Sequence, residues 1–299
     1  MNPTLTQEIE WLGLRFLVPE QWQIVRHGLV PEAGSLVLVD RRHQRLNLSW
    51  TQCQRRPDLT RLVEDYLGKE ADIEPATEIE RFTCGRRWRG IRQRKPGGEV
   101  ISRGVLYHEQ TSRLVELLVI LPPGAKEDQQ LVDQILTSFR VTAAAEECRR
   151  WNAFDIALTT PPDFRLSSSS VKPADTTLRF VQVDGAKGKP TRTEATIRRL
   201  GMARCWYDGS LERVVQAHFP EQRFSESQKL SHPGSEAYFA RGTEPGPPVK
   251  RMLRRLRERR VLCWHVPEQN AVYELVTLSP PQRPVLPTDF QFESAGGAA

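Results

Sequence analysis

Two pairs of apolar stretches recur along the chain in the same order, and their apolar–polar patterning is typical of β-strands. Ser35–Asp40 (SLVLVD) matches Leu178–Asp184 (LRFVQVD), and Val115–Pro123 (VELLVILPP) matches Tyr273–Pro281 (YELVTLSPP). Both members of the second pair carry a glutamate at the second position and end in two prolines. Repetition at this length predicts an internal duplication.

Between these strands, each half of the chain contains one stretch with apolar residues at helical spacing. Five residues with spacing i, i+3, i+4, i+7 and i+8 recur position for position: Leu59, Leu62, Val63, Tyr66 and Leu67 in the first half, and Leu211, Val214, Val215, His218 and Phe219 in the second. This spacing places them on one face of an α-helix. Asp58 and Ser210 stand just before the two stretches and are suitable N-cap residues.

The repeat sets the predicted domain boundaries. An apolar strand followed by proline and an aromatic residue opens both copies, at Phe16–Trp22 and at Phe154–Phe164. The first copy ends with an apolar helical stripe from Leu131 to Phe139, whereas Pro284 and Pro287 preclude a long helix at the end of the second. We therefore predict four segments: a first copy (1–142), a linker (143–150), a second copy without the closing helix (151–293) and a disordered tail (294–299).

Strand patterns joined by hairpin turns, with few helices and no alternation of parallel strands and helices, predict an α+β fold. In this fold each copy is an antiparallel sheet covered by helices. The turn Lys95–Glu99 (KPGGE) is one such hairpin signal. The run Ser167–Ser170 is expected in a loop.

Several of these motifs together resemble the PsbP-like superfamily. They are the strand leading into Val18–Trp22 (VPEQW), the amphipathic helix, a strand with Trp88, the LVELLVI strand and the closing ILTSF helix. The superfamily includes the photosystem subunit PsbP, a nuclear-import factor that binds the GTPase Ran, bacterial DcrB-type proteins and the Eag chaperones of type VI secretion. The resemblance covers most of residues 8–141 and, more loosely, 151–293. It implies a non-enzymatic binding or chaperone protein, without catalytic residues to transfer.

Charge is concentrated in one segment. The net charge is +6, and residues 1–149 contain as many acidic as basic residues. The run KRMLRRLRERR alone contributes seven basic residues, which are the candidate partner-binding residues: Lys250, Arg251, Arg254, Arg255, Arg257, Arg259 and Arg260. Such a run suits an exposed hairpin, an acidic protein partner or nucleic-acid phosphates. The hairpin Arg86–Lys95 of the first copy is also rich in arginine.

Residues with catalytic or metal-binding chemistry lack the spacing that such sites need. The five cysteines form no CxxC pair, and the six histidines form no HxH or HxxxH motif, so we expect no metal and no cofactor. Cys263 and His265 share a strand face, but residues two apart on a strand are about 6–7 Å apart at the backbone. A Cys–His nucleophile needs the two side chains within hydrogen-bond reach and a third group that orients them, so the spacing argues against catalysis here. Glu116 and Glu274 are expected on the solvent face of the sheet, and the seven tryptophans in the core.

These observations favour a non-enzymatic adaptor or chaperone whose two copies form a fused pseudo-dimer, with an apolar groove between sheet faces for a protein client. The alternative is a nucleic-acid-associated subunit of a larger complex that uses the arginine-rich segment. The N-terminus lacks a secretory signal pattern and the longest apolar run contains Glu116, so we expect a cytoplasmic protein without a membrane span.

Overall fold

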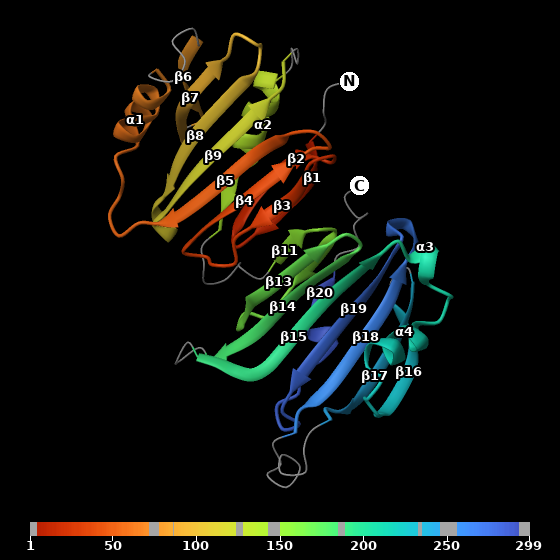
Figure 1. The fold of residues 1–299 in the computed structure, drawn as a ribbon. Helices are drawn as coiled ribbons and strands as arrows, with labels where there is room; N and C mark the ends of the chain where they lie inside the picture. Colours follow the sequence, from red (N-terminus) through yellow and green to blue (C-terminus); the bar gives the residue numbers. More distant parts are fainter. Residues whose placement is uncertain are drawn as a thin grey trace. The chain divides into compact units, whose positions relative to one another are not determined.

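The computed structural model describes residues 5–71, 78–85, 87–123, 128–142, 150–184, 189–232, 235–245 and 256–292. The chain divides into two compact units, Met1–Ala157 and Leu158–Ala299 (Figure 1). The predicted linker falls almost wholly, at 143–149, outside the described residues, as does the predicted tail at 294–299. Each unit is described by itself below.

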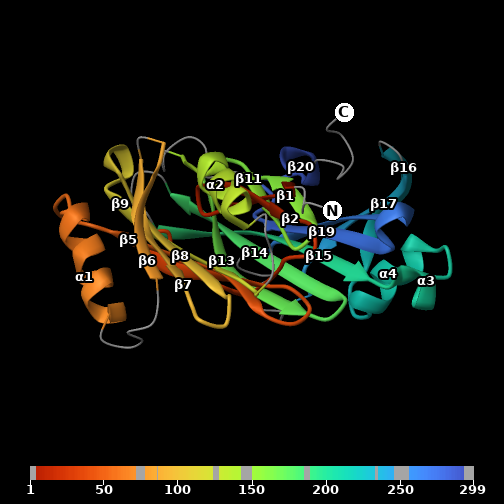
Figure 2. The same cartoon turned by 90° about the horizontal axis from the view of Figure 1, so that it is seen from above.

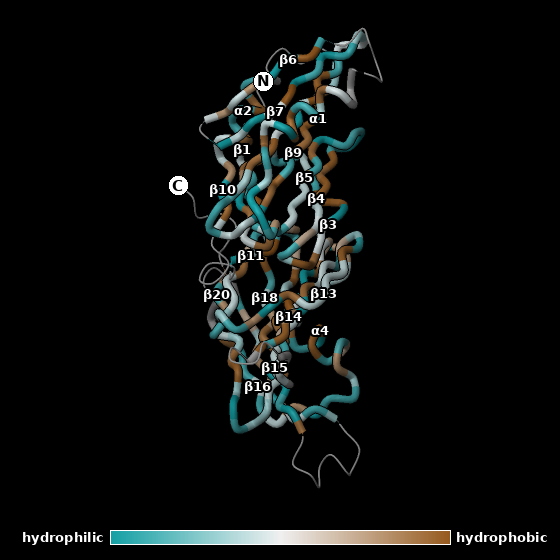
Figure 3. The backbone as a smooth tube through the Cα atoms, turned by 90° about the vertical axis from the view of Figure 1, so that its left-hand side faces the viewer, coloured by the Kyte–Doolittle hydropathy of each residue, from teal (hydrophilic) through white to brown (hydrophobic). Residues whose placement is uncertain are grey.

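The first unit contains a seven-stranded sheet, called here the first sheet. Its order is β3-β4-β5-β9-β8-β7-β6, and every neighbouring pair is antiparallel. The strands are β3 (Gln23–His27), β4 (Ala33–Val39), β5 (Gln44–Gln52), β6 (Glu78–Cys84), β7 (Trp88–Arg94), β8 (Val100–His108) and β9 (Arg113–Leu121). Burial alternates residue by residue along β9, because successive side chains point to opposite faces of a sheet. Figure 3 shows hydrophobic and hydrophilic stretches interspersed along the strands.

Two layers cover the first sheet. Helix α1 (Leu59–Ala71) contacts β7 and β8 on one face, where Val63 and Tyr66 pack with Ile91 and Val105. Helix α2 (Asp128–Ser138) lies on the opposite side (Figure 2). It packs on β2, which belongs to a row of four short strands: β10 (Arg140–Val141), β2 (Leu14–Pro19), β1 (Leu5–Trp11) and β11 (Arg150–Ala153).

The second unit repeats this strand order. Its seven-stranded second sheet runs β13-β14-β15-β19-β18-β17-β16, so each strand occupies the place of its counterpart in the first sheet. The strands are β13 (Phe164–Lys172), β14 (Asp175–Asp184), β15 (Lys189–Gly201), β16 (Phe224–His232), β17 (Ser235–Thr243), β18 (Glu258–Val266) and β19 (Ala271–Ser279). A 3-10 turn joins the last two strands of both sheets, η1 (Glu109–Thr111) in the first and η2 (Pro267–Gln269) in the second. The shared order supports a duplication.

The helices of the second unit differ from those of the first. The one-turn helix α3 (Ala203–Trp206) precedes α4 (Leu211–His218), whose buried face packs against β17 and β18. After β19 the chain forms the 3-10 turn η3 (Pro287–Asp289) and then β20 (Gln291–Phe292), which pairs with β12 (Ile156–Thr159). All residues between β19 and β20 are described, and none of them forms an α-helix.

Both predicted amphipathic helices are confirmed, together with their N-caps. The carboxylate of Asp58 accepts hydrogen bonds from the backbone N–H of Thr60 (2.9 Å) and of Arg61 (3.2 Å). The hydroxyl of Ser210 accepts one from the N–H of Arg213 at 3.3 Å. These bonds satisfy donors that have no partner inside the first turn of a helix.

The predicted fold class is wrong. Strands dominate the described residues, with twenty strands against four α-helices, so the protein is mainly antiparallel β-structure and not an α+β fold covered by helices. The helix layers are small, since α4 has 8 residues, whereas β15 of the same unit has 13. The loop predicted at Ser167–Ser170 is also wrong, because this run lies in the edge strand β13. The residue pattern identified the strands but overestimated how much of each sheet the helices cover.

Candidate binding pocket

The arginine-rich segment is described only from Leu256 onward. Four of its predicted partner-binding residues lie outside the described residues: Lys250, Arg251, Arg254 and Arg255. The other three lie at or just before the start of β18: Arg257, Arg259 and Arg260. Their guanidinium groups are bound within the second unit.

Arg257 is bound by two acidic side chains, one on β15 and one directly after β17. Its Nε and Nη2 each donate to Glu244 at 3.0 Å, and its Nη1 donates to Glu194 at 2.8 Å. The hydrogen bonds to Glu244 raise the pKa of Arg257 further above its usual range. Bidentate pairing of this kind fixes the geometry of an arginine as well as its charge.

Arg259 and Arg260 lie on opposite faces of β18, and each is bound to groups of its own unit. The guanidinium of Arg259 lies 4.8 Å above the ring of Phe219 and donates to Gln222 Oε1 at 3.0 Å. Arg260 is only 4% exposed and donates to Glu258 at 2.5 Å and to the carbonyl of Val285 at 3.3 Å. In the described part of the segment, arginine therefore stabilises β18. Partner binding by the seven predicted residues stays a prediction.

The two recurring glutamates do not face solvent as expected. Glu274 is 2% exposed and lies beneath α4, where its Oε2 is 3.0 Å from Nδ1 of His218. In the first unit, the hydroxyl of Tyr66 on α1 donates to Glu116 at 2.5 Å. Each helix is thus tied to the central strand of its sheet at an equivalent position. The sequence pattern correctly placed both glutamates on the same face of their strands. That face is covered by a helix in each unit and is not open to solvent.

Cys263 and His265 do not form a nucleophile–base pair. The Cys263 thiol is fully buried against α4, and burial raises its pKa well above the usual value. The ring of His265 packs instead on Tyr207, with 4.6 Å between centroids. No cluster of three histidine, cysteine or acidic side chains suited to a metal ion occurs among the described residues.

Six of the seven tryptophans are buried, as predicted, and the exception is Trp206 on α3, which is 44% exposed. One of the six, Trp88, forms the floor of an open pocket in the first unit. Its indole N–H donates to the carbonyl of Leu136 at 3.0 Å, which binds the start of β7 to the end of α2. Gly104 on the neighbouring strand leaves room for the indole, since a Cβ there would lie 3.1 Å from the ring.

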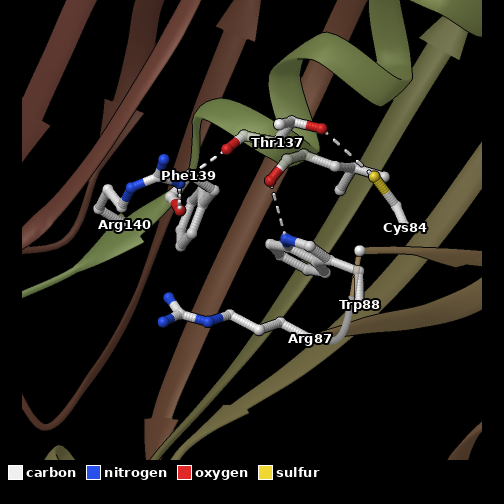
Figure 4. Close-up of a pocket in the computed structure, with 8 residues that line it drawn as sticks. Cys84, Arg87, Trp88, Thr137, Phe139 and Arg140 are labelled. Carbon is white, nitrogen blue, oxygen red and sulfur yellow. Dashed lines mark hydrogen bonds between the residues drawn. The ribbon is translucent and has the colours of Figure 1, made fainter.

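Phe139 completes the apolar floor of this pocket, which we call the Trp88 pocket. Its ring meets Trp88 edge to face at 5.2 Å and stacks on Phe16 at 5.5 Å. The Trp88 pocket has a volume of about 360 Å³ and eight lining residues: Cys84, Gly85, Arg87, Trp88, Leu136, Thr137, Phe139 and Arg140 (Figure 4). Aromatic pairs of this geometry form a rigid apolar surface.

Two exposed arginines form the rim of the Trp88 pocket. Arg87 and Arg140 carry their guanidinium groups to the same side of the pocket, beside the Phe139 ring (Figure 4). Nη1 of Arg140 donates to the carbonyls of Thr137 (2.7 Å) and Phe139 (2.8 Å), at the end of α2. Neither arginine forms an ion pair with an acidic side chain in the part of the chain that the structure describes, and no acidic residue lines the pocket. The arrangement suits a ligand with an apolar part and a negative charge.

The sequence patterns did not predict this site. They placed Trp88 in the core and the arginines around it on an exposed hairpin. The local signal is the run Gly85–Trp88 (GRRW), which combines a turn, two cations and an aromatic ring. The other half of the pocket comes from the segment Leu136–Arg140, about fifty residues away in sequence, and only the packing of α2 brings it there.

A second open pocket, of about 250 Å³, lies beside α1 on the opposite face of the first sheet, and Asn47, Tyr66, Arg103 and Glu116 are among its lining residues. Its charged groups are already engaged, because Tyr66 donates to Glu116 and the Arg103 guanidinium lies 4.9 Å above the Tyr66 ring. The Trp88 pocket is therefore the stronger candidate. Among the described residues, no helix is long and apolar enough to cross a membrane.

Comparisons with known proteins add little to this geometry. No protein-family model matches the chain, and no curated protein is similar to it. A solved structure, "Apo structure of immunity protein TplEi of T6SS from Pseudomonas aeruginosa", aligns with 94% of this chain and 90% of its own at 11% identity, with a TM-score of 0.36. A score this low does not establish a shared fold. The tandem PsbP-like assignment stays a prediction.

Proposed function

We propose that this protein is a binding module, an adaptor or chaperone that captures a segment of a protein partner in the Trp88 pocket. The observation that carries the proposal is the pairing of an aromatic floor with two rim arginines, neither of which has an acidic partner among the described residues. Rigid aromatic side chains and arginine contribute much of the binding energy in protein interfaces.

The pocket has the features of a recognition site. Its floor is held by the Trp88–Leu136 hydrogen bond and by ring packing with Phe16, so the apolar surface exists before a ligand arrives. A preformed surface avoids part of the ordering cost of binding. The arginines at the rim are exposed and supply charge for orientation and for attraction of an acidic segment.

Nucleic-acid binding by the arginine-rich segment is the alternative, and the described residues favour it less. Arg257, Arg259 and Arg260 already bind side chains of their own unit, so phosphates would have to replace those contacts. Phosphate binding by Lys250, Arg251, Arg254 and Arg255 stays a prediction. If the segment binds nucleic acid, the affinity should fall steeply as the salt concentration rises.

Co-purification from the native host tests the proposal. The tagged full-length protein is compared with Arg87→Glu, which reverses one rim charge without removing an internal bond, and with Arg94→Glu as the matched control. Arg94 is an exposed arginine at the far end of the same strand, β7, and does not line the pocket.

We expect a stoichiometric protein partner with the wild type and with Arg94→Glu, and its loss with Arg87→Glu. Reversal of one interfacial charge weakens binding by about 1.4 to 2.8 kcal/mol, or about ten- to hundredfold. The proposal is wrong if no partner is recovered with the wild type, or if Arg87→Glu recovers the same partner in the same amount.

A further inference from the structure

We propose that the Trp88 pocket binds the C-terminal residue of a polypeptide, with the free carboxylate at Arg87 and Arg140 and an apolar side chain on the Trp88 and Phe139 rings. This inference rests on the proposed function and names the chemistry of the partner segment. It follows from which polar groups of the pocket are already bonded, from the nature of its floor and from its size.

The hydrogen-bond acceptors around the pocket are already in use. The Leu136 carbonyl accepts from the Trp88 indole, and the carbonyls of Thr137 and Phe139 accept from Arg140. The Thr137 hydroxyl lies 3.5 Å from the Cys84 sulfur. A ligand ammonium group would have to share these acceptors with their present donors and would face the positive charges of Arg87 and Arg140.

The polar groups of the pocket that are not yet bonded are hydrogen-bond donors. Arg87 has no hydrogen bond to a described residue, and the bonds of Arg140 use only its Nη1. Two guanidinium groups on one side of a pocket match a carboxylate, which accepts two parallel N–H bonds from a single arginine. Charge complementarity thus points to an anion, and none of the eight described lining residues is acidic.

The floor and the volume restrict what carries this anion. Three buried apolar side chains, those of Trp88, Leu136 and Phe139, form the floor. A volume of about 360 Å³ is near the lower end of ligand-site volumes, which suits one or two residues of a peptide. Inorganic phosphate would use the arginines but would not contact the accessible apolar edges of this floor, whose residues are 2 to 3% exposed.

A C-terminal residue combines both requirements on one Cα atom. Its carboxylate and its side chain start from the same carbon, so one residue reaches the rim and the floor together. An internal aspartate or glutamate carries the charge on its only side chain, and a second residue must then supply the apolar group. Capture of a terminal carboxylate is an established mode of peptide recognition.

Fluorescence anisotropy with the full-length protein tests the inference. The probe is a hexapeptide of alternating glycine and serine that ends in leucine, labelled at its N-terminus, with a free carboxylate. The same peptide as its C-terminal amide removes the charge, and a version ending in glycine removes the side chain. The protein variants are Arg87→Gln with Arg140→Gln, and Arg94→Gln as the matched control.

We expect the free acid to bind, and the amide and the glycine peptide to bind at least about tenfold more weakly. The double variant should lose binding, and Arg94→Gln should keep it. Arg140→Gln also removes bonds at the end of α2, so Arg87→Gln alone, which breaks no internal bond, must weaken the free acid by itself. Inorganic phosphate should compete only weakly.

Four results overturn the inference. They are equal binding of acid and amide, no effect of Arg87→Gln, no binding of the free acid up to about 1 mM, and displacement by a single-stranded oligonucleotide at lower concentration than by an unlabelled peptide. A partner that depends on Arg87 in co-purification but not on its own C-terminal residue would refute this inference and leave the proposed function intact. Absence of any partner would refute the proposed function itself.

Discussion

At the residue scale, each unit ties its helix to its central strand through one glutamate. The two bonds differ in environment. Glu274 is 2% exposed and its Oε1 has no hydrogen-bond partner among the described residues, so His218 is the group that keeps this buried carboxylate bonded. Glu116 is half-buried and accepts from the Tyr66 hydroxyl. An unpaired buried charge is costly, so the two bonds should differ in their effect on stability.

We expect His218→Ala to lower the free energy of unfolding by about 2 to 3 kcal/mol, because it leaves Glu274 buried without its partner. Tyr66→Phe should cost only about 1 kcal/mol, since water reaches Glu116. Urea denaturation of the full-length protein measures both. Adding Glu274→Gln to His218→Ala should restore part of the loss, because the buried group is then neutral. A loss below about 0.5 kcal/mol for His218→Ala would contradict this reading of the contact.

Two cysteines should differ sharply in reactivity. Burial raises the pKa of Cys263 and keeps it a thiol, whereas Cys205 on α3 is exposed. Because the thiolate is the nucleophile, a thiol reagent such as Ellman's reagent should modify Cys205 at once and Cys263 only after unfolding. Mass spectrometry of the labelled peptides identifies the site. Labelling of Cys263 in the folded protein as fast as Cys205 would show that the core under α4 is not closed.

At the element scale, the turn between β4 and β5 depends on one carboxylate. Asp40 Oδ1 accepts from the backbone N–H of Arg42 and of His43, both at 2.7 Å, and Oδ2 accepts from Arg45 at 2.6 Å. Burial disfavours the charge, but these hydrogen bonds and the charge of Arg45 outweigh it and lower the pKa of Asp40 to about 2. The ionised form therefore stabilises the hairpin.

The pH dependence follows from the direction of that pKa. The pKa of an aspartate in an unfolded chain is about 3.9. The stabilisation by Asp40 is therefore complete above this pH and is lost as the pH falls toward about 2. We expect Asp40→Asn to lower the free energy of unfolding by about 1 kcal/mol at pH 7, a difference that shrinks as the pH falls through this range. Denaturation curves of both proteins across that interval measure it. A difference that is constant with pH would show that the charge of Asp40 does not matter.

Elements were the part of the structure that the sequence predicted best. Helical spacing located α1 and α4, and alternation located β9 and β19, because these patterns report which face is buried. Patterns do not report what covers the other face. The same limit explains the misplaced Glu116 and Glu274, the overestimated helix layer and the Trp88 pocket, whose two halves meet only through the packing of α2.

At the scale of the whole molecule, the duplicated strand order contrasts with what each unit adds to it. Only the first unit has α2, and the Trp88 pocket depends on α2 because Leu136, Thr137 and Phe139 come from the end of that helix or just after it. In the second unit, the 3-10 turn η3 stands between β19 and β20, where the first unit has α2 after β9. The proposed binding role is therefore assigned to the copy that retains the closing helix.

The central claim is that a protein partner occupies the Trp88 pocket, and site-specific photocrosslinking in the native host tests it most directly. A photoreactive amino acid replaces Thr137, an exposed residue that lines the pocket, or Gln134, an exposed residue one turn earlier on α2 that does not. The account predicts a discrete crosslinked partner from position 137 and none from position 134. No adduct from position 137, or the same adducts from both positions, would contradict it.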